Sequence, residues 1–396
     1  MKKLVIKNIG QIISGKLEEP IFDGDCMIAI DGKITEWGYE KDLDCEGATT
    51  LVDAHGVTVM PGLIDSHIHP VIGDYTPRQQ QLNWIDSTLH GGVTTLISAG
   101  EVHMPGRPKD IVGLKAMAIA AQRWYENFRP SGVKVHAGAP VIEHGMVEQD
   151  FKDLADAGVT LLGEVGLGTV KDGKTAQQMV GWARKYGIQS TIHTGGPSIP
   201  GSGLIDADMV METGTDVIGH INGGHSALPD DQIICLCENC SAAFEIVHNG
   251  NERAAVLTIN TARELGKLDQ VILGTDGPAG SGVQPLGIMR MVAMLSAFGN
   301  VPAAEAFCFG HGNTSRQRNL DTGLIEAGYA ADIVVPGAER GEFGGEIEIL
   351  LLHPDHCISP PSPAGRRRLR HCRRPPRRVQ RIPGSRQPAP LSCRRT

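Results

Sequence analysis

The sequence predicts an α/β protein: a (β/α)8 TIM barrel with a small β-sandwich domain built from the N- and C-terminal segments. Two observations carry this prediction. Eight short apolar, strand-like runs recur along the chain, and stretches with helical spacing separate them, an alternation typical of a closed parallel barrel. The first 60 residues instead show the alternation and the turn residues, such as Asp31-Gly32, of a hairpin-rich sheet.

The hairpin-rich segment, residues 1–60, is expected to form the first part of the small domain. Its strands are predicted within residues 1–15, 26–37 and 49–59. The barrel is expected over residues 61–320. A chain of 396 residues with 41% hydrophobic content can bury one barrel and still supply a smaller domain.

The barrel strands are predicted from their apolar runs. They are expected within residues 61–70, 92–99, 133–139, 159–164, 188–193, 217–220, 242–247 and 271–276. Helical spacing marks residues 111–128, which follow Pro108, a residue suited to a helix start. A second helix is expected over residues 176–186, where Gly187 favours termination.

A His-x-His pair closes the first of these runs. Alternate strand residues face the same side, so His67 and His69 should point together. That spacing alone is also typical of hydrogen-bonded core or surface histidines. Four further side chains with metal-ligand chemistry end later runs in the same way: Glu164, His193, His220 and Asp276. Because function in a TIM barrel lies at the carboxyl ends of the strands, we expect all six to meet around metal ions.

These features resemble the amidohydrolase superfamily over roughly residues 1 to 335. The resemblance is carried by Pro-Gly-Leu-Ile-Asp-Ser-His-Ile-His at the first barrel strand, by histidines on the fifth and sixth strands, and by aspartate on the eighth. Within the superfamily the chain is most similar to the bacterial enamidases of nicotinate fermentation. The shared motifs are Gly-Asp-Tyr-Thr-Pro-Arg-Gln (73–79), Pro-Gly-Arg-Pro-Lys-Asp (105–110), Gly-Glu-Val-Gly-Leu-Gly-Thr (163–169), His-Thr-Gly-Gly (193–196) and His-Ile-Asn-Gly-Gly (220–224).

The resemblance implies two divalent metal ions, zinc or iron, with a defined ligand set. One ion would be held by His67, His69 and Asp276 and the other by His193 and His220, with Glu164 bridging the pair. Many superfamily members use a carboxylated lysine as the bridge, whereas this chain offers a glutamate, as enamidase-like members do. No lysine competes on that strand, because Lys152 and Lys171 lie outside it. The resemblance also implies that residues 321–335 return from the barrel to the small domain.

The implied activity is hydrolysis of a cyclic amide. For an enamidase the substrate would be 1,4,5,6-tetrahydro-6-oxonicotinate, opened to 2-formylglutarate with release of ammonia. Asp276 is the predicted catalytic residue: it would accept a proton from water activated between the metals and pass it to the departing nitrogen. The simpler interpretation is that this aspartate is a metal ligand only.

The carboxylate of such a substrate requires cationic or amide-rich partners. Arg78, Arg107 and Lys109 follow the first two barrel strands and are the candidate substrate-binding residues. Each is equally typical of a solvated surface charge or a loop anchor. His225 and His248 follow later strands, and we assign neither to catalysis.

Two alternatives stay open at this point. Another cyclic amidohydrolase, of the dihydroorotase, hydantoinase or imidazolonepropionase type, would use the same chemistry on a different ring. A non-catalytic amidohydrolase-like scaffold is the third possibility. The intact ligand set argues against the scaffold, because a chain released from catalysis has no physical need for six such side chains around a cavity.

The expected partners are a small-molecule cyclic amide and, as is common among superfamily members, further copies of the chain in a homo-oligomer. Met1-Lys2-Lys3 is followed by only three apolar residues before Lys7, too few for a signal-peptide core, so a cytoplasmic location is expected, with no membrane partner. The nine cysteines are scattered, which suits reduced thiols. Three of them, Cys235, Cys237 and Cys240, are interpreted as helix packing rather than a structural metal site.

The carboxyl-terminal tail, residues 336–396, departs from this pattern. From Arg366 onward it contains 12 arginines and no lysine or acidic residue. Without these 12, 25 of the 37 basic residues remain against 45 acidic ones, so the body carries a formal charge of −20. The tail has no aromatic interleaving or recognisable nucleic-acid-binding module, so no nucleic-acid partner is expected. Translation in an alternate reading frame, or disorder, is the hypothesis for this segment.

Overall fold

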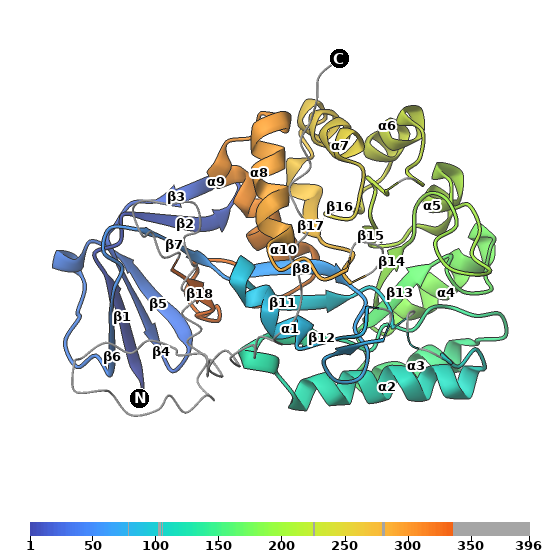
Figure 1. Cartoon of the computed structure of the whole chain (residues 1–396), viewed down its shortest axis with the longest axis horizontal. Helices are drawn as coiled ribbons and strands as arrows, with labels where there is room; N and C mark the ends of the chain where they lie inside the picture. The colour runs from blue at the N-terminus through green and yellow to red at the C-terminus, as the bar shows by residue number, and fades with distance from the viewer. Residues whose placement is uncertain (78, 102–103, 105, 225, 279–281, 336–396) are drawn as a thin grey trace, which may run out of the picture. The chain divides into compact units, whose positions relative to one another are not determined.

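The computed structural model of the chain describes residues 1–335 apart from 78, 102–103, 105, 225 and 279–281 (Figure 1). The predictions for Arg78, His225 and the tail therefore fall outside the described residues. Within the described part, no helix combines the length and the apolar character needed to cross a membrane.

Two four-stranded sheets form the small domain. The first has the strand order β5-β4-β1-β6 and the second β18-β7-β2-β3. Their bounds are β1 (Lys3–Lys7), β2 (Gln11–Lys16), β3 (Glu19–Phe22), β4 (Cys26–Ile30), β5 (Lys33–Gly38), β6 (Thr50–Asp53), β7 (Thr58–Pro61) and β18 (Ile333–Val334). Ile6, Ile12, Ile34, Val59 and Ile333 belong to one buried apolar cluster. The late strand β18 pairs antiparallel with β7, so both ends of the described chain contribute to this domain.

Eight parallel strands form the second structural region, in sheets of three (β12-β11-β8) and five (β13 to β17 in order). They are β8 (Leu63–Ile68), β11 (Val93–Ser98), β12 (Lys134–His136), β13 (Leu161–Val165), β14 (Gln189–Ile192), β15 (Val217–Ile218), β16 (Ala243–Val247) and β17 (Val271–Gly274). Backbone hydrogen bonds join the two sheets at both edges: His69 N to Gly277 O at 2.8 Å, and Gly163 N to Pro140 O, just after β12, at 2.9 Å. The strands thus follow one another around a ring.

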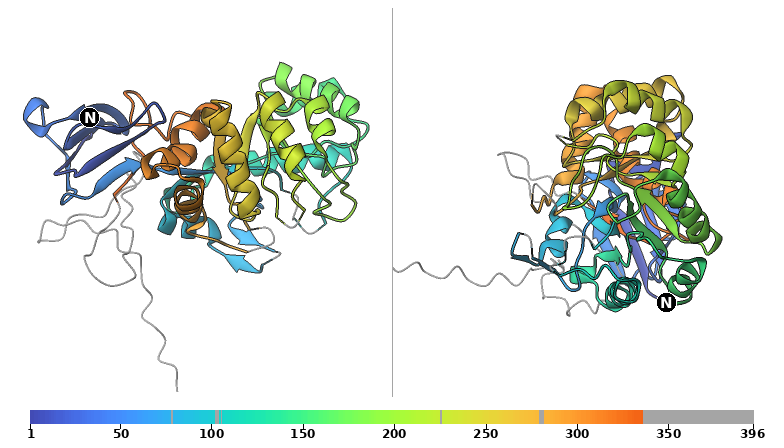
Figure 2. Two further views of the ribbon diagram at one scale, coloured as in Figure 1. Left: turned by 90° about the horizontal axis from the view of Figure 1, so that it is seen from above. Right: turned by 90° about the vertical axis from the view of Figure 1, so that its right-hand side faces the viewer.

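Helices cover the outside of the strands, as Figures 1 and 2 show. The longer ones are α2 (Ile111–Asn127), α3 (Glu148–Asp156), α4 (Gly173–Lys185), α6 (Asp230–Asn239), α7 (Glu252–Glu264) and α8 (Gly287–Gly299), and the shorter ones are α1 (Trp84–Ser87), α5 (Ala207–Thr213), α9 (Ala303–Cys308) and α10 (Thr314–Gln317). Two of them fall where helical spacing predicted them, but their starts follow capping aspartates. Asp110 accepts from Gly113 N, and α2 begins at Ile111 as predicted; Asp172 accepts from Thr175 N, and α4 begins three residues before 176.

The cysteine interpretation agrees with the packing. Cys235 and Cys237 lie in α6 and Cys240 is its C-cap residue, and Cys237 is fully buried. All six cysteines in the described ranges are free thiols. Burial raises the pKa of the Cys237 thiol to about 12, so this group is inert near neutral pH.

Tyr125 on α2 secures the loop that follows the first barrel strand. Its ring is 1% exposed, and its hydroxyl donates to Val71 O at 2.5 Å and also contacts Gly73 O. Tyr125→Phe should lower the free energy of unfolding by about 1–3 kcal/mol, because buried carbonyl oxygens lose their donor. Urea unfolding measures this difference.

The matched control for this substitution is Tyr186→Phe. The Tyr186 hydroxyl donates to Glu148, whose side chain is 40% exposed, so water replaces the lost bond and the change should stay within about 0.5 kcal/mol. Equal losses in the two variants would contradict the assignment of Tyr125 as a buried anchor of the loop.

Candidate metal centre

The six predicted ligands all lie at the carboxyl ends of barrel strands. His67 is in β8 and His69 directly follows it, and Glu164 is in β13. His193 is the first residue after β14, and His220 and Asp276 are each the second residue after β15 and β17. In a barrel this placement turns side chains toward the same mouth. The structure brings all six together.

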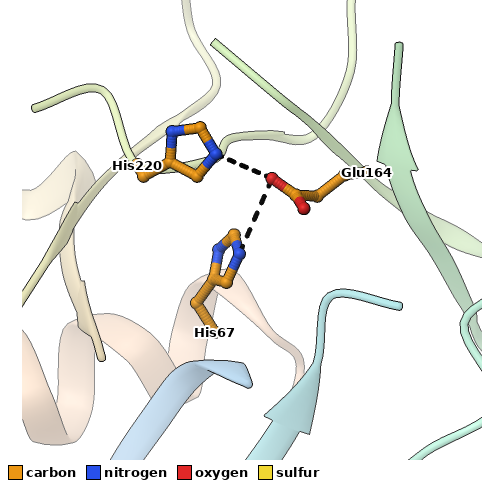
Figure 3. A group of neighbouring side chains, drawn as sticks. All are labelled: His67, Glu164 and His220. Carbon is orange, nitrogen blue, oxygen red and sulfur yellow. Dashed lines mark hydrogen bonds and ion pairs between the residues drawn. The ribbon is translucent and has the colours of Figure 1, made fainter. Parts of the chain in front are cut away.

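Glu164 lies at the centre of the cluster. Its Oε1 is 2.8 Å from His220 Nε2, 3.4 Å from His193 Nδ1 and 3.7 Å from His67 Nε2. Its Oε2 is 3.5 Å from His69 Nε2. Figure 3 shows one carboxylate oxygen facing the rings of both His67 and His220. One glutamate therefore contacts all four histidines.

The charge state of Glu164 follows from these contacts. The residue is only 2% exposed, and burial raises a carboxyl pKa. Hydrogen bonds with His193 and His220 and the charge of His67 outweigh that effect and hold the pKa of Glu164 well below its usual range. Glu164 is thus a carboxylate, which is the form that ligates metal.

Asp276 closes the other side of the cluster. Its Oδ1 is 3.1 Å from His69 Nε2 and 3.8 Å from His67 Nε2, and Asn249 Nδ2 donates to its Oδ2 at 3.4 Å. Both Asp276 (φ 56°) and His220 (φ 31°) have left-handed backbone conformations. Such strain in non-glycine residues is retained where surrounding structure imposes it, and it concentrates at functional sites.

In three of the histidines, the ring nitrogen that faces away from Glu164, the outer nitrogen, has a hydrogen-bond acceptor. His67 Nδ1 is 2.5 Å from Glu245 Oε2, His69 Nδ1 is 2.8 Å from Gly100 O, and His193 Nε2 is 2.9 Å from Gly196 O. Each acceptor favours the tautomer that carries its proton on the outer nitrogen. The inner nitrogen of each ring is then the atom that can bind either a proton or a metal ion beside the carboxylates of Glu164 and Asp276.

A nitrogen lone pair and a carboxylate oxygen repel each other unless a proton or a metal ion lies between them. Within the described residues, His67 Nε2, which faces both carboxylates, is a buried nitrogen atom without a hydrogen-bond partner. Two groups have ligand atoms within 4.8 Å of one another: His67, Glu164 and His220, and His67, His69 and Asp276. Imidazole and carboxylate ligands backed by outer acceptors fit divalent metal ions.

The predicted division of ligands between two ions stays a prediction. His67 belongs to both groups, although the sequence interpretation placed it with His69 and Asp276 alone. His193 completes neither group, but its Nδ1 faces Glu164. Lys171, the lysine nearest in sequence to the bridging strand, donates its Nζ to Gly166 O at 2.8 Å.

Three residues at this site were missed by the sequence analysis: Glu245, Arg318 and Asn249. Glu245 gave a signal, because it is a charged residue inside the apolar run 242–247. Asn249 follows the end of β16, as the ligands follow other strands. Arg318 lies just after α10 and gave no signal, since only the folded chain brings it to Glu245, with 3.1 Å between Nη2 and Oε1.

The candidate substrate-binding residues differ sharply in their surroundings. Arg107, between β11 and α2, has a side chain that is 9% exposed, and its Nη1 lies 3.5 Å from Glu143 Oε1. That nitrogen has no hydrogen-bond partner within the described part of the chain. Lys109 is exposed to solvent. His248, after β16, has its Nε2 3.3 Å from Arg290 Nη1.

A ring of parallel strands that carries histidines and carboxylates at its carboxyl mouth defines a metal-dependent hydrolase of the barrel type. The chain belongs to the amidohydrolase family, whose sequence profile matches residues 58–340. This family uses divalent metals. The predicted family and the α/β barrel fold class are thereby confirmed.

Among known proteins the chain is similar to the enamidase of Eubacterium barkeri, with 44% identity over 341 residues that cover 86% of this chain and 88% of the relative. A crystal structure of enamidase has a TM-score of 0.84 and 43% identity, and the match covers 87% of this chain and 90% of that one. A β-aspartyl dipeptidase from Fervidobacterium islandicum AW-1 matches with a TM-score of 0.61, 19% identity, and coverage of 88% and 95%. That last likeness bears on the fold alone.

Proposed function

We propose that this chain is an enamidase-type hydrolase that opens a cyclic amide with two divalent metal ions held by His67, His69, Glu164, His193, His220 and Asp276. The observation that carries the proposal is the contact of Glu164 with all four histidines, in a chain 44% identical to an enamidase over 341 residues. The proposed substrate is 1,4,5,6-tetrahydro-6-oxonicotinate. Zinc and iron both suit this ligand set.

When bound, the two ions would supply an acidified water and a polarised amide carbonyl. The protein's own part is to move the proton. The Asp276 side chain is 18% exposed, so solvent and substrate can reach it. It accepts the proton of the attacking water and delivers it to the ring nitrogen, because an unprotonated amide nitrogen is a poor leaving group.

The overall reaction consumes two waters. The first cleaves the ring amide and leaves a carboxylate and an enamine nitrogen on the opened chain. The second hydrolyses the enamine, through its imine form, to an aldehyde and ammonia. The products are 2-formylglutarate and ammonia, which together contain every atom of the oxonicotinate and the two waters.

Ammonia release from the oxonicotinate ring is the decisive assay. We expect turnover by metal-loaded protein and little turnover of dihydroorotate, hydantoin or imidazolone propionate under the same conditions. Metal analysis should give about two equivalents of zinc or iron per chain. Two bound equivalents without oxonicotinate turnover would redirect the assignment to another cyclic amide, and a folded protein that binds no metal would indicate a scaffold.

Arg107 is the favoured partner for the substrate carboxylate. Its side chain is 9% exposed, and its Nη1, 3.5 Å from Glu143 Oε1, has no hydrogen-bond partner in the described part of the chain, whereas Lys109 is exposed. Arg107→Gln should raise KM by about 10–100-fold, because a charge-assisted hydrogen bond contributes roughly 1.5–3 kcal/mol. Steady-state kinetics measure the change.

The neighbouring Lys109→Ala variant is the control for Arg107 and should leave KM within about twofold of the unmodified protein. A thermal melt of both variants checks that loss of the Arg107 contact with Glu143 has not unfolded the loop. If Arg107→Gln keeps its KM, the carboxylate partner lies elsewhere, and Arg78 becomes the first residue to test.

Cellular location and assembly remain predictions. We propose a cytoplasmic homo-oligomer without nucleic-acid or membrane partners. Light scattering on purified full-length protein gives the oligomeric state, and cell fractionation gives the location.

A further inference from the structure

A buried polar network lies behind His67, on the side away from the other ligands. It contains Glu245, Ser66 and Arg318, whose exposed fractions are 0%, 0% and 6%. Charged side chains are rarely buried to this extent without a specific arrangement of partners. Here the network connects His67 and its strand to Arg318, which also reaches the neighbouring strand β14.

The Glu245 carboxylate has two different environments. Its Oε2 is 2.5 Å from His67 Nδ1. Its Oε1 accepts from Ser66 Oγ at 2.5 Å and from Arg318 Nη2 at 3.1 Å. One oxygen therefore orients the histidine, and the other is held by two donors.

Arg318 is itself fixed by several acceptors besides Glu245 Oε1. Its Nε donates to Ser66 Oγ at 2.9 Å, which turns the serine proton toward Glu245, and its Nη2 donates to Ser66 O at 2.9 Å. Its Nη1 donates to Thr191 Oγ1 at 3.1 Å on the neighbouring strand β14. A planar guanidinium fixed on both sides cannot turn away, so the carboxylate orientation is fixed as well.

We propose that Glu245 is a positioning residue that keeps the His67 proton on Nδ1, and that Arg318 and Ser66 fix Glu245 in the orientation this requires. His67 then presents an unprotonated Nε2 toward Glu164 and Asp276, 3.7 Å and 3.8 Å away. This inference rests on the proposed metal-dependent function. It assigns roles to residues that lie outside the predicted set of six metal ligands and act through His67.

The glutamine variant Glu245→Gln tests the proposal because an amide has one donor end and one acceptor end. The Arg318 and Ser66 donors require the amide oxygen on their side, so the amide NH2 group must face His67 Nδ1. The ring then takes the opposite tautomer and points Nε2–H at the metal position. The variant keeps the size of the side chain and changes only this choice.

The primary measurement is metal affinity of the purified full-length chain, by competition with a chelator. We expect Glu245→Gln to bind zinc about 10–100-fold more weakly. The double variant Glu245→Gln with Arg318→Met should recover roughly tenfold of that loss, because the amide can then turn its oxygen to His67 and donate to Ser66. A purely structural role predicts the opposite order, with the double variant weaker than the single one.

Tautomers provide a second measurement that does not depend on the double variant folding. In metal-free protein labelled with 15N-histidine, the neutral ring of His67, assigned by its loss in His67→Asn, should be protonated at Nδ1 in the parent and at Nε2 in Glu245→Gln. Unchanged affinity, or Nδ1 protonation in both proteins, would overturn the inference. Failure of the parent to bind zinc would instead refute the proposed function, so the two failures are distinguishable.

Discussion

Asp276→Asn should lower the turnover number for the cyclic amide by about 10²–10⁴-fold while leaving the metal content near that of the parent. Asparagine retains an oxygen that can contact a metal ion. It has no basic oxygen to take the proton of the attacking water, because an amide is not protonated near neutral pH. The loss should therefore appear in kcat rather than in KM.

The result separates the two roles proposed for this aspartate. A fall in rate with metal retained supports proton transfer by Asp276. A proportional loss of metal and rate would mean that the residue is only a ligand. Asp216→Asn is the matched control, because Asp216 precedes β15 and so lies at the opposite end of the barrel strands. There it accepts from Ser190 N at 2.8 Å. The kcat of this variant should stay within about twofold of the parent value.

The clustering of the six predicted ligands could be predicted because each of them ends or follows an apolar strand run. Barrel topology then brings these strand ends together regardless of their separation in sequence. His67 and Asp276 are more than two hundred positions apart, yet Asp276 N donates to His67 O at 2.9 Å. The signal lay in the change from apolar to polar residues, which sequence records directly.

The groups that orient the histidines were not predictable in the same way. Gly100 O and Gly196 O are backbone acceptors whose direction depends on loop conformation. Arg318 reaches Glu245 from a segment after the last barrel strand. Nothing in the local pattern around any of these residues indicates which histidine nitrogen it will meet.

The sequence also could not distinguish between two candidate substrate-binding residues in a single loop. Arg107 and Lys109 are two positions apart and carry the same charge, and the sequence treated them as equivalent candidates. In the fold Arg107 is buried beside Glu143 while Lys109 is exposed. Burial in an irregular loop is set by tertiary packing, which leaves no periodicity to interpret.

Glu164→Gln should reduce bound metal from about two equivalents to fewer than one and remove detectable turnover, a loss of at least about 10³-fold. The two carboxylates of the cluster supply the only negative side-chain charges among the six ligands, against the four positive charges of two divalent ions. Glutamine removes one of them. Its NH2 group would also donate to a histidine lone pair that a metal ion needs.

Glu101→Gln is the matched control for this substitution. Glu101 is 1% exposed and lies in the loop after the barrel strand β11. Its carboxylate accepts from Gly138 N at 2.8 Å and from Ala139 N at 3.1 Å. Burial raises the pKa of Glu101, so replacing its charge with a neutral amide costs less than at an unburied carboxylate. Inductively coupled plasma analysis after dialysis should find parent-like metal in Glu101→Gln, and two retained equivalents in Glu164→Gln would contradict a bridging role for Glu164.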